Sequence, residues 1–169
     1  VHIYGHGWPV RWGEDGEEKE VLVYSNCQAV ELFLNGESLG VRKRNSQDFP
    51  AAGLRWNVKF KKGKNTLKAV AVEGKQTLND ELVFEYQTEK WGKETAFDVK
   101  TTPVGDGIVE VEAQLVDEKG TRCLDSRVFV YFDIAGDGKL IQNQGTATGS
   151  RKVQARNGRA QIRVRTNQG

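Results

Sequence analysis

Apolar and polar residues alternate one for one in three stretches of the sequence, residues 54–60, 109–115 and 160–165. Successive side chains of a β-strand point to opposite faces, so a period of two is typical of a half-buried strand. No window of roughly 11 residues or more shows the 3.6-residue period of a helix. We therefore expect an all-β chain, with Trp56 in its core because it shares a face with Leu54 and Val58.

Shorter strands and their turns extend this pattern. Two Asn-Gly pairs, Asn35-Gly36 and Asn157-Gly158, predict two-residue hairpin turns, because both central residues need a positive φ. Residues 61–65 and 117–120 are expected to form longer hairpin loops. Regularly spaced short strands suggest β-sandwiches. Further strands are expected at residues 19–24, 29–34, 38–42, 66–72, 82–87, 97–101, 128–134 and 152–155.

The length of 169 residues allows one domain or two small ones. A polar segment at residues 88–94 separates two strand-rich halves, so we expect two tandem immunoglobulin-like β-sandwich domains, residues 1–87 and 88–169. The chain has no Met and starts within a strand pattern, which suggests a piece of a longer protein.

The charge balance limits the partners. The 25 Lys+Arg against 23 Asp+Glu give a net charge of +2, too little for a surface built to bind a polyanion. No apolar run approaches the roughly 18 residues of a membrane span. We therefore expect neither a nucleic-acid partner nor a membrane.

The histidines and cysteines are few. His2 and His6 would lie about 13 Å apart on one extended strand, too far to share a metal ion with bonds of about 2 Å. Only a bend at Gly5 would bring them together, and we expect no metal site. Cys27 and Cys123 are 96 residues apart and are expected to be two separate buried thiols in different domains.

The charged clusters also have plain structural interpretations. A fragment of a calcium-loop pattern, Asp133, Gly136 and Asp137, lacks the full spacing and is more simply a bend. We expect no catalytic residue and no cofactor in this chain, since adjacent exposed acids give no means of separating two pKa values. The acidic run is expected to be a solvated loop and strand start: Glu14, Asp15, Glu17, Glu18 and Glu20. The basic run is expected to be the solvent face of a hairpin: Arg151, Lys152, Arg156, Arg159, Arg163 and Arg165.

Aromatic residues in irregular, polar segments are the candidate contact residues. These are Tyr4, Trp8, Trp12 and Trp91. Exposed aromatics on a rigid β scaffold can seal an interface with a neighbouring domain or stack on the apolar face of a sugar. Both interpretations stay open on these residues.

The first half resembles a known family. The similarity lies in residues 2–12, HIYGHGWPVRW, residues 21–27, VLVYSNC, and residues 30–40, VELFLNGESLG, with support from residues 55–58 and 67–71. This pattern is similar to the domain that follows the catalytic barrel in bacterial β-galactosidase-type enzymes of glycoside hydrolase family 2.

The second half resembles the next domain of the same enzymes, an immunoglobulin-like or invasin-like module. The similar segments are residues 111–120, 136–140 and 156–160. These motifs also fit generic immunoglobulin-like repeats of surface proteins. Related chains continue with a further strand, so the resemblance leaves open that the second domain is cut short.

The resemblance implies that the parent enzyme cleaves terminal β-linked sugars, galactosides in particular, with two glutamates on its barrel. The barrel is not in this chain, so no catalytic residue is carried over. The implied role is an accessory region that packs against the catalytic barrel of the same chain, in the periplasm or outside the cell. A carbohydrate-binding module, immunoglobulin-like adhesion repeats and a contact in a homo-oligomer are the alternatives.

Overall fold

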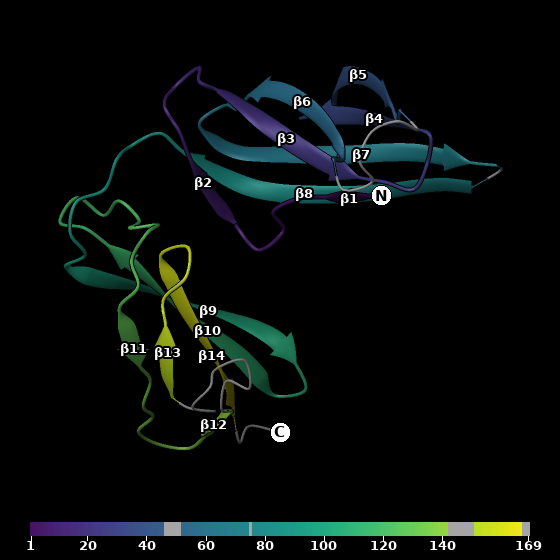
Figure 1. Ribbon diagram of the computed structural model, residues 1–169. Helices are drawn as coiled ribbons and strands as arrows, with labels where there is room; N and C mark the ends of the chain where they lie inside the picture. Colours follow the sequence, from purple (N-terminus) through teal and green to yellow (C-terminus); the bar gives the residue numbers. More distant parts are fainter. Residues whose placement is uncertain (46–51, 75, 142–150, 167–169) are drawn as a thin grey trace. The chain divides into compact units, whose positions relative to one another are not determined.

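A computed structural model describes residues 1–45, 52–74, 76–141 and 151–166 (Figure 1). The regular elements of these ranges are all β-strands, and this confirms the all-β prediction. No helix that could cross a membrane occurs in the described part of the chain. The chain divides into two compact units, Val1–Glu89 and Lys90–Gly169. The boundary expected from the sequence lies two residues before this division, after Gln87.

The first unit is a sandwich of two sheets. The three-stranded sheet has the order β1-β3-β6 and the five-stranded sheet the order β2-β8-β7-β4-β5. All neighbours are antiparallel except β2 and β8. The strand bounds are β1 (His2–Ile3), β2 (Val10–Trp12), β3 (Glu18–Tyr24), β4 (Ala29–Leu34), β5 (Glu37–Lys43), β6 (Leu54–Lys59), β7 (Gly63–Glu73) and β8 (Gln76–Gln87).

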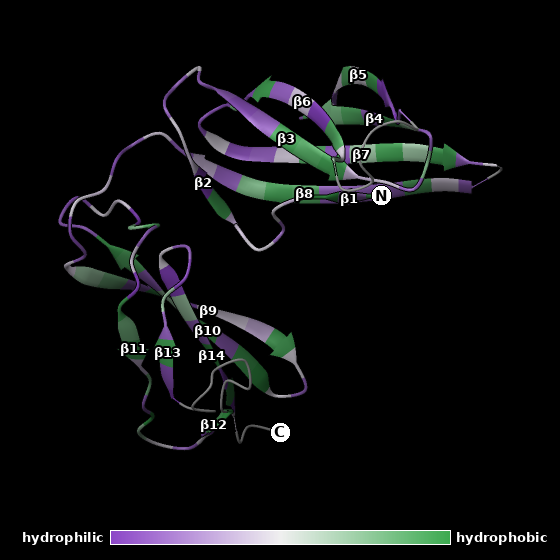
Figure 2. Cartoon of the chain, viewed as in Figure 1, coloured by the Kyte–Doolittle hydropathy of each residue, from purple (hydrophilic) through white to green (hydrophobic). Residues whose placement is uncertain are grey.

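The core of the first unit follows from the alternation along these strands, which Figure 2 shows as bands of hydrophobic and hydrophilic residues on β7 and β8. Trp56 is buried as predicted, and its Nε1 donates to the carbonyl of Gly40. Three aromatic rings pack together in this core, where Phe60 contacts both Phe84 and Tyr86. Both sheets supply core residues, so burial of their facing sides holds the sandwich together.

The predicted hairpin loop at residues 61–65 is wrong. β6 pairs with β3 and β7 pairs with β4 and β8, so the segment between them carries the chain from one sheet to the other. Asn65 is fully buried there, and its amide donates to the carbonyls of Lys61 and Gly63. Its Oδ1 accepts the N–H of Lys61, so one buried amide satisfies the polar backbone of the crossing.

The second unit is built from smaller sheets. A four-stranded sheet has the order β12-β14-β10-β9, and a two-stranded sheet pairs β11 with β13. The buried cluster of described residues consists of Ala113, Leu115, Val130, Val153, Ala155 and Ala160. The strand bounds are β9 (Ala96–Gly105), β10 (Ile108–Val116), β11 (Phe129–Tyr131), β12 (Lys139–Ile141), β13 (Lys152–Gln154) and β14 (Arg159–Arg165).

The two Asn-Gly turns are confirmed. Asn35 and Gly36 have φ of 52° and 89°, and Asn157 and Gly158 have φ of 50° and 64°. The first joins the hairpin β4–β5, whereas the second leads from β13 into β14 of the other sheet. The loop after β10 is also a tight turn, closed by a bridge between Val116 and Arg122.

The remaining sequence-based expectations concern thiols and charges. Cys27 and Cys123 are both buried and free, one in each unit, as predicted. Glu14, Asp15, Glu17, Glu18 and Glu20 are exposed, which confirms a solvated loop and strand start. Gly136 has φ of 98° in a bend between β11 and β12. Arg163 and Arg165 are exposed on β14 as predicted, but β13 and β14 belong to different sheets and do not pair as one hairpin.

Candidate functional site

The amino-terminal segment, residues 1–12, folds back on itself against the first unit. β1 pairs with β3, and β2 pairs with β8 of the other sheet. The reversal between them depends on Gly5, whose φ is 104°. This φ favours glycine, and a Cβ at this position would also lie 2.5 Å from Nη2 of Arg11.

The reversal brings His2 and His6 together. Their ring centroids are 5.1 Å apart, and the planes of the two rings are nearly parallel. The separation of about 13 Å expected for one extended strand is therefore wrong. The physical reason is the bend at Gly5, which stops the strand at Ile3 and returns His6 beside His2.

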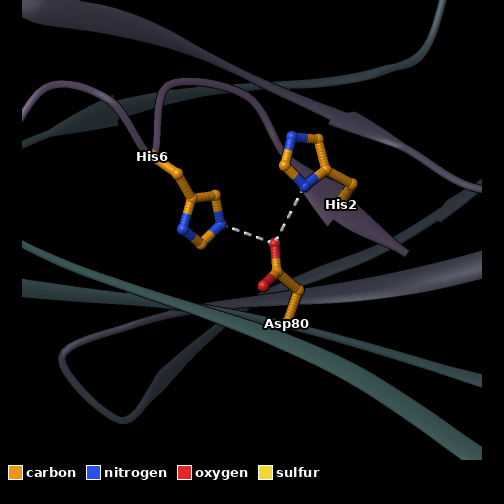
Figure 3. Close-up of side chains that lie close together, drawn as sticks. All are labelled: His2, His6 and Asp80. Atoms are coloured by element: carbon orange, nitrogen blue, oxygen red, sulfur yellow. Dashed lines mark hydrogen bonds and ion pairs between the residues drawn. The ribbon is translucent and has the colours of Figure 1, made fainter. Parts of the chain in front are cut away.

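Both rings face one carboxylate of β8 (Figure 3). Nε2 of His6 lies 2.8 Å from Oδ2 of Asp80, and Nδ1 of His2 lies 3.7 Å from the same oxygen. The backbone N–H of Ile3 also donates to this oxygen, at 2.7 Å. Asp80 thus ties the amino-terminal segment to the five-stranded sheet.

The electrostatics of Asp80 follow from these contacts. Partial burial of its side chain, which is 20% exposed, opposes the charged form. The Ile3 amide and the two imidazoles together outweigh that burial and hold the pKa of Asp80 below its usual range. The carboxylate is therefore charged at neutral pH and is a fixed acceptor.

Two imidazoles and a carboxylate are also possible metal ligands. One ligand atom from each of His2, His6 and Asp80 lies within 4.8 Å of the others. A tetrahedral zinc ion with bonds of about 2 Å would need ligand atoms about 3.3 Å apart. In the structure Oδ2 of Asp80 accepts the N–H of Ile3 and lies beside both imidazoles. Hydrogen bonding alone accounts for the observed geometry.

The same segment presents two exposed aromatic rings. Tyr4 and Trp8 are 51% and 44% exposed, and their rings meet edge to face with centroids 5.4 Å apart. Arg11 supports the loop from below, since its Nη2 donates to the carbonyls of Tyr4 and Gly5. Its guanidinium lies 4.5 Å from the ring centre of Phe84, and burial lowers its pKa from the usual value. The aromatic pair therefore sits on a well-supported loop.

The other two predicted contact residues belong to other elements of the chain. Trp12 is half-buried on β2, with Nζ of Lys19 5.9 Å from its ring centre. Trp91 belongs to the second unit and donates from Nε1 to Oδ1 of Asp125. The structure brings together Tyr4 and Trp8 of the four residues, and a contact role for all four stays a prediction.

Sequence reasoning missed Asp80. The signal was its phase on β8, because Leu78, Leu82 and Phe84 share its face and point inward. A charged residue in the apolar phase of a strand must have a polar partner. That partner proved to be the amino-terminal segment.

Comparisons with known proteins show that nearly the whole chain is similar to segments of larger glycosidases. A family model described as a domain of unknown function (DUF4982) matches residues 16–78. The sequence is 44% identical over 166 residues to a protein of Formosa agariphila provisionally named a beta-glucuronidase, covering 98% of this chain and 20% of the relative. It is 30% identical over 145 residues to the beta-galactosidase BoGH2A of Bacteroides ovatus, covering 82% of this chain and 15% of the relative.

Among solved structures, the beta-glucuronidase of Parabacteroides merdae matches with a TM-score of 0.90 and 55% identity. The match covers 99% of this chain and 21% of that protein. The chain thus spans about a fifth or less of the length of the relatives it matches.

Proposed function

We propose that this chain, a β-sandwich region of a family 2 glycoside hydrolase, is an accessory part that packs against the catalytic domain of that enzyme. The observation that carries the proposal is the extent of the matches. Nearly the whole chain aligns, yet it accounts for about a fifth of the glycosidases that it resembles. The regions that match this chain are therefore segments of larger enzymes.

The exposed pair Tyr4 and Trp8 is the contact surface that we propose. Large aromatic rings are costly to leave in water and dominate the energetics of interfaces. The Asp80 anchor and Arg11 hold the loop in place, so little conformational entropy is lost when a partner covers it. The catalytic domain of the same polypeptide is the partner that the family membership favours.

For the parent enzyme we propose hydrolysis of a terminal β-linked sugar, with β-glucuronides as the first substrates to test. The relatives at 44% and 55% identity are named beta-glucuronidases, and the one at 30% a beta-galactosidase. The two carboxylates that such chemistry needs would lie in the catalytic domain, outside this chain. We further propose a periplasmic or extracellular location.

The test uses the full parent polypeptide with Tyr4→Ala and Trp8→Ala together. We expect a lower Tm for the parent enzyme and a reduced kcat/KM on an aryl β-glucuronide. The isolated chain should keep its stability within about 0.5 kcal/mol, because both residues are exposed there. Val72→Ala, at an exposed apolar side chain of β7, is the matched control.

An unchanged Tm and unchanged kinetics in the double variant would contradict the proposed contact. A parent enzyme that keeps both properties after deletion of the whole chain would contradict the accessory role itself. The substrate assignment is tested separately, by comparing aryl β-glucuronide with aryl β-galactoside.

A further inference from the structure

The two-stranded sheet of the second unit has an unusual outward face. β11 and β13 are antiparallel, with Phe129 opposite Gln154 and Tyr131 opposite Lys152. Phe129 and Tyr131 are 51% and 70% exposed, although both are aromatic. Residues two apart on a strand share one face, so both rings lie on the outward face of the sheet.

A lysine lies against both rings. Nζ of Lys152 is 4.5 Å from the ring centre of Phe129 and 5.3 Å from that of Tyr131. Such cation–π contacts hold a charge beside the rings without burying it. The face therefore combines apolar stacking surface with a positive charge at a fixed place.

The opposite face of this sheet is anchored in the core. Val130 and Val153 are buried, and Val128 and Phe132 pack against the same cluster. Two hydrogen bonds continue the ladder beyond the strands, from the N–H of Ala155 to Val128 and from the N–H of Phe132 to Arg151. The aromatic surface is thus carried by a backbone with a fixed position in the unit.

Arginines extend the positive charge along the face. Arg127 lies two residues before β11 and Arg156 two residues after β13, and both are exposed. Of the acids beside the sheet, Asp125 accepts from Trp91 and Asp133 pairs with Arg151.

From this arrangement we propose that the outward face of β11 and β13 binds an acidic sugar unit of a polysaccharide. A pyranose ring has an apolar face that can stack on Phe129 or Tyr131, as aromatic surfaces favour. Its carboxylate would pair with Lys152 or with the arginines, because charge-assisted hydrogen bonds are the strong ones. The exposed amide of Gln154 offers a further hydrogen bond to a hydroxyl group.

Single-stranded nucleic acid would also use aromatic and basic residues, but it fits less well. Such sites follow the strand with an extended basic groove. The second unit has thirteen basic and ten acidic residues, and the aromatic surface of this face consists of two rings. The inference does not depend on the accessory role, because it concerns a different unit from the Tyr4–Trp8 pair.

The test is affinity electrophoresis of the full 169-residue chain in gels that contain glucuronoxylan, polygalacturonate or alginate. Neutral xylan is the matched polymer without charge. We expect retardation by at least one acidic polymer and none by xylan. An oligosaccharide of the retarding polymer then gives the affinity by titration, followed through the backbone NMR signals of Val130 and Val153.

Variants locate the site. Tyr131→Ala and Phe129→Ala should each weaken binding about fivefold to tenfold, and Lys152→Gln about fivefold. Phe97→Ala, which removes a 55% exposed aromatic from β9 of the same unit, should leave the affinity unchanged. Circular dichroism confirms that each variant is folded.

Three results would overturn the proposal. The first is no retardation by any of the three acidic polymers. The second is equal binding of xylan or of an oligo-dT probe, which would indicate an unspecific or a nucleic-acid surface. The third is a loss of affinity in Phe97→Ala that matches the loss in Tyr131→Ala, which would show that the face of β11 and β13 is not the specific site.

Discussion

The two units reach a sandwich by different means. Among described residues, the first unit buries a cluster of fifteen side chains, with Trp56, Phe60, Phe84 and Tyr86 among them. The second buries a cluster of six, three of which are alanines. Burial of large apolar side chains is the main stabilising term of a domain, so the second unit has much less of it. The difference shows that a similar architecture can depend on very different shares of apolar packing.

The second unit also has polar contacts at its turns. Oδ1 of Asp117 accepts the N–H groups of Lys119 and Thr121, and Oδ2 accepts the N–H of Gly92. On the outer face of the sheet, Arg159 donates to Glu112 at 2.6 Å. Such contacts fix loops and register more than they add to the total free energy.

The comparison is tested most strongly by a matched pair of core truncations, Leu67→Ala in the first unit and Leu115→Ala in the second. Both leucines are fully or almost fully buried. Each change should cost about 2–5 kcal/mol, with the larger loss at Leu67 because a large, tightly packed core collapses less around a cavity. Urea unfolding, monitored in each unit by hydrogen exchange, measures the loss of unfolding free energy. A larger loss at Leu115 would contradict the argument from core size.

The substitution Asn65→Ala tests whether the stability of the first unit also depends on a polar contact. The change leaves the Lys61 and Gly63 carbonyls without their donor in a buried place, and we expect a loss of about 2 kcal/mol. Chemical denaturation of the full chain measures the loss. The control is Asn79→Ala on the exposed side of β8, which should stay within about 0.5 kcal/mol of the parent sequence. Equal effects at Asn65 and Asn79 would show that the crossing needs no buried amide.

The Asn-Gly turns allow a smaller, sharper comparison, Gly36→Ala against Gly158→Ala. Both glycines have positive φ, so both changes carry a backbone strain of about 1 kcal/mol. A Cβ on Gly36 meets open space, whereas one on Gly158 would lie 2.8 Å from the carbonyl oxygen of Cys123. Gly158→Ala should therefore cost about 1 kcal/mol more. Thermal unfolding of both variants compares the two losses of stability, and equal shifts in Tm would rule out the steric contribution.

Acid should destabilise both units, with the smallest effect of these tests. The N–H of Gly92 lowers the pKa of Asp117, aided by the N–H groups of Thr121 and Lys119 against the effect of burial. Its folded pKa lies below the unfolded value of about 3.9. The contribution to stability is thus complete above that pH and is lost as the pH falls through the folded pKa.

Asp117→Asn should remove this pH-dependent part of the second unit's stability. Unfolding of each unit between about pH 2 and 6 checks it. Asp80→Asn is the counterpart in the first unit, where the pKa is also lowered. An unchanged acid profile of the second unit in Asp117→Asn would show that the three amides do not favour the charged carboxylate.

The strands were predictable wherever one face is buried and the other exposed. The strand at residues 29–34 agrees with β4 residue for residue, because Val30 and Leu32 point inward between more exposed neighbours. β9 was expected at residues 97–101 but runs to Gly105. All of its residues are exposed, so pairing with β10 and not a hydrophobic period sets its length.

The features that sequence reasoning missed depend on contacts between distant residues. His2 and His6 meet because Gly5 reverses the chain and Asp80, far along the sequence, holds the segment. The aromatic face of β11 was hidden because Val128, Val130 and Phe132 are apolar as well. With apolar residues in both phases, periodicity cannot tell which face is covered.

Each unit contains one buried thiol whose rate of chemical labelling depends on how often that unit opens. A reagent for thiols reaches Cys27 only when the first unit opens and Cys123 only when the second does. Burial raises the pKa of the Cys123 thiol, and this further suppresses reaction in the closed state. The rates of labelling at the two sites therefore report how often each sandwich opens, without any engineered probe.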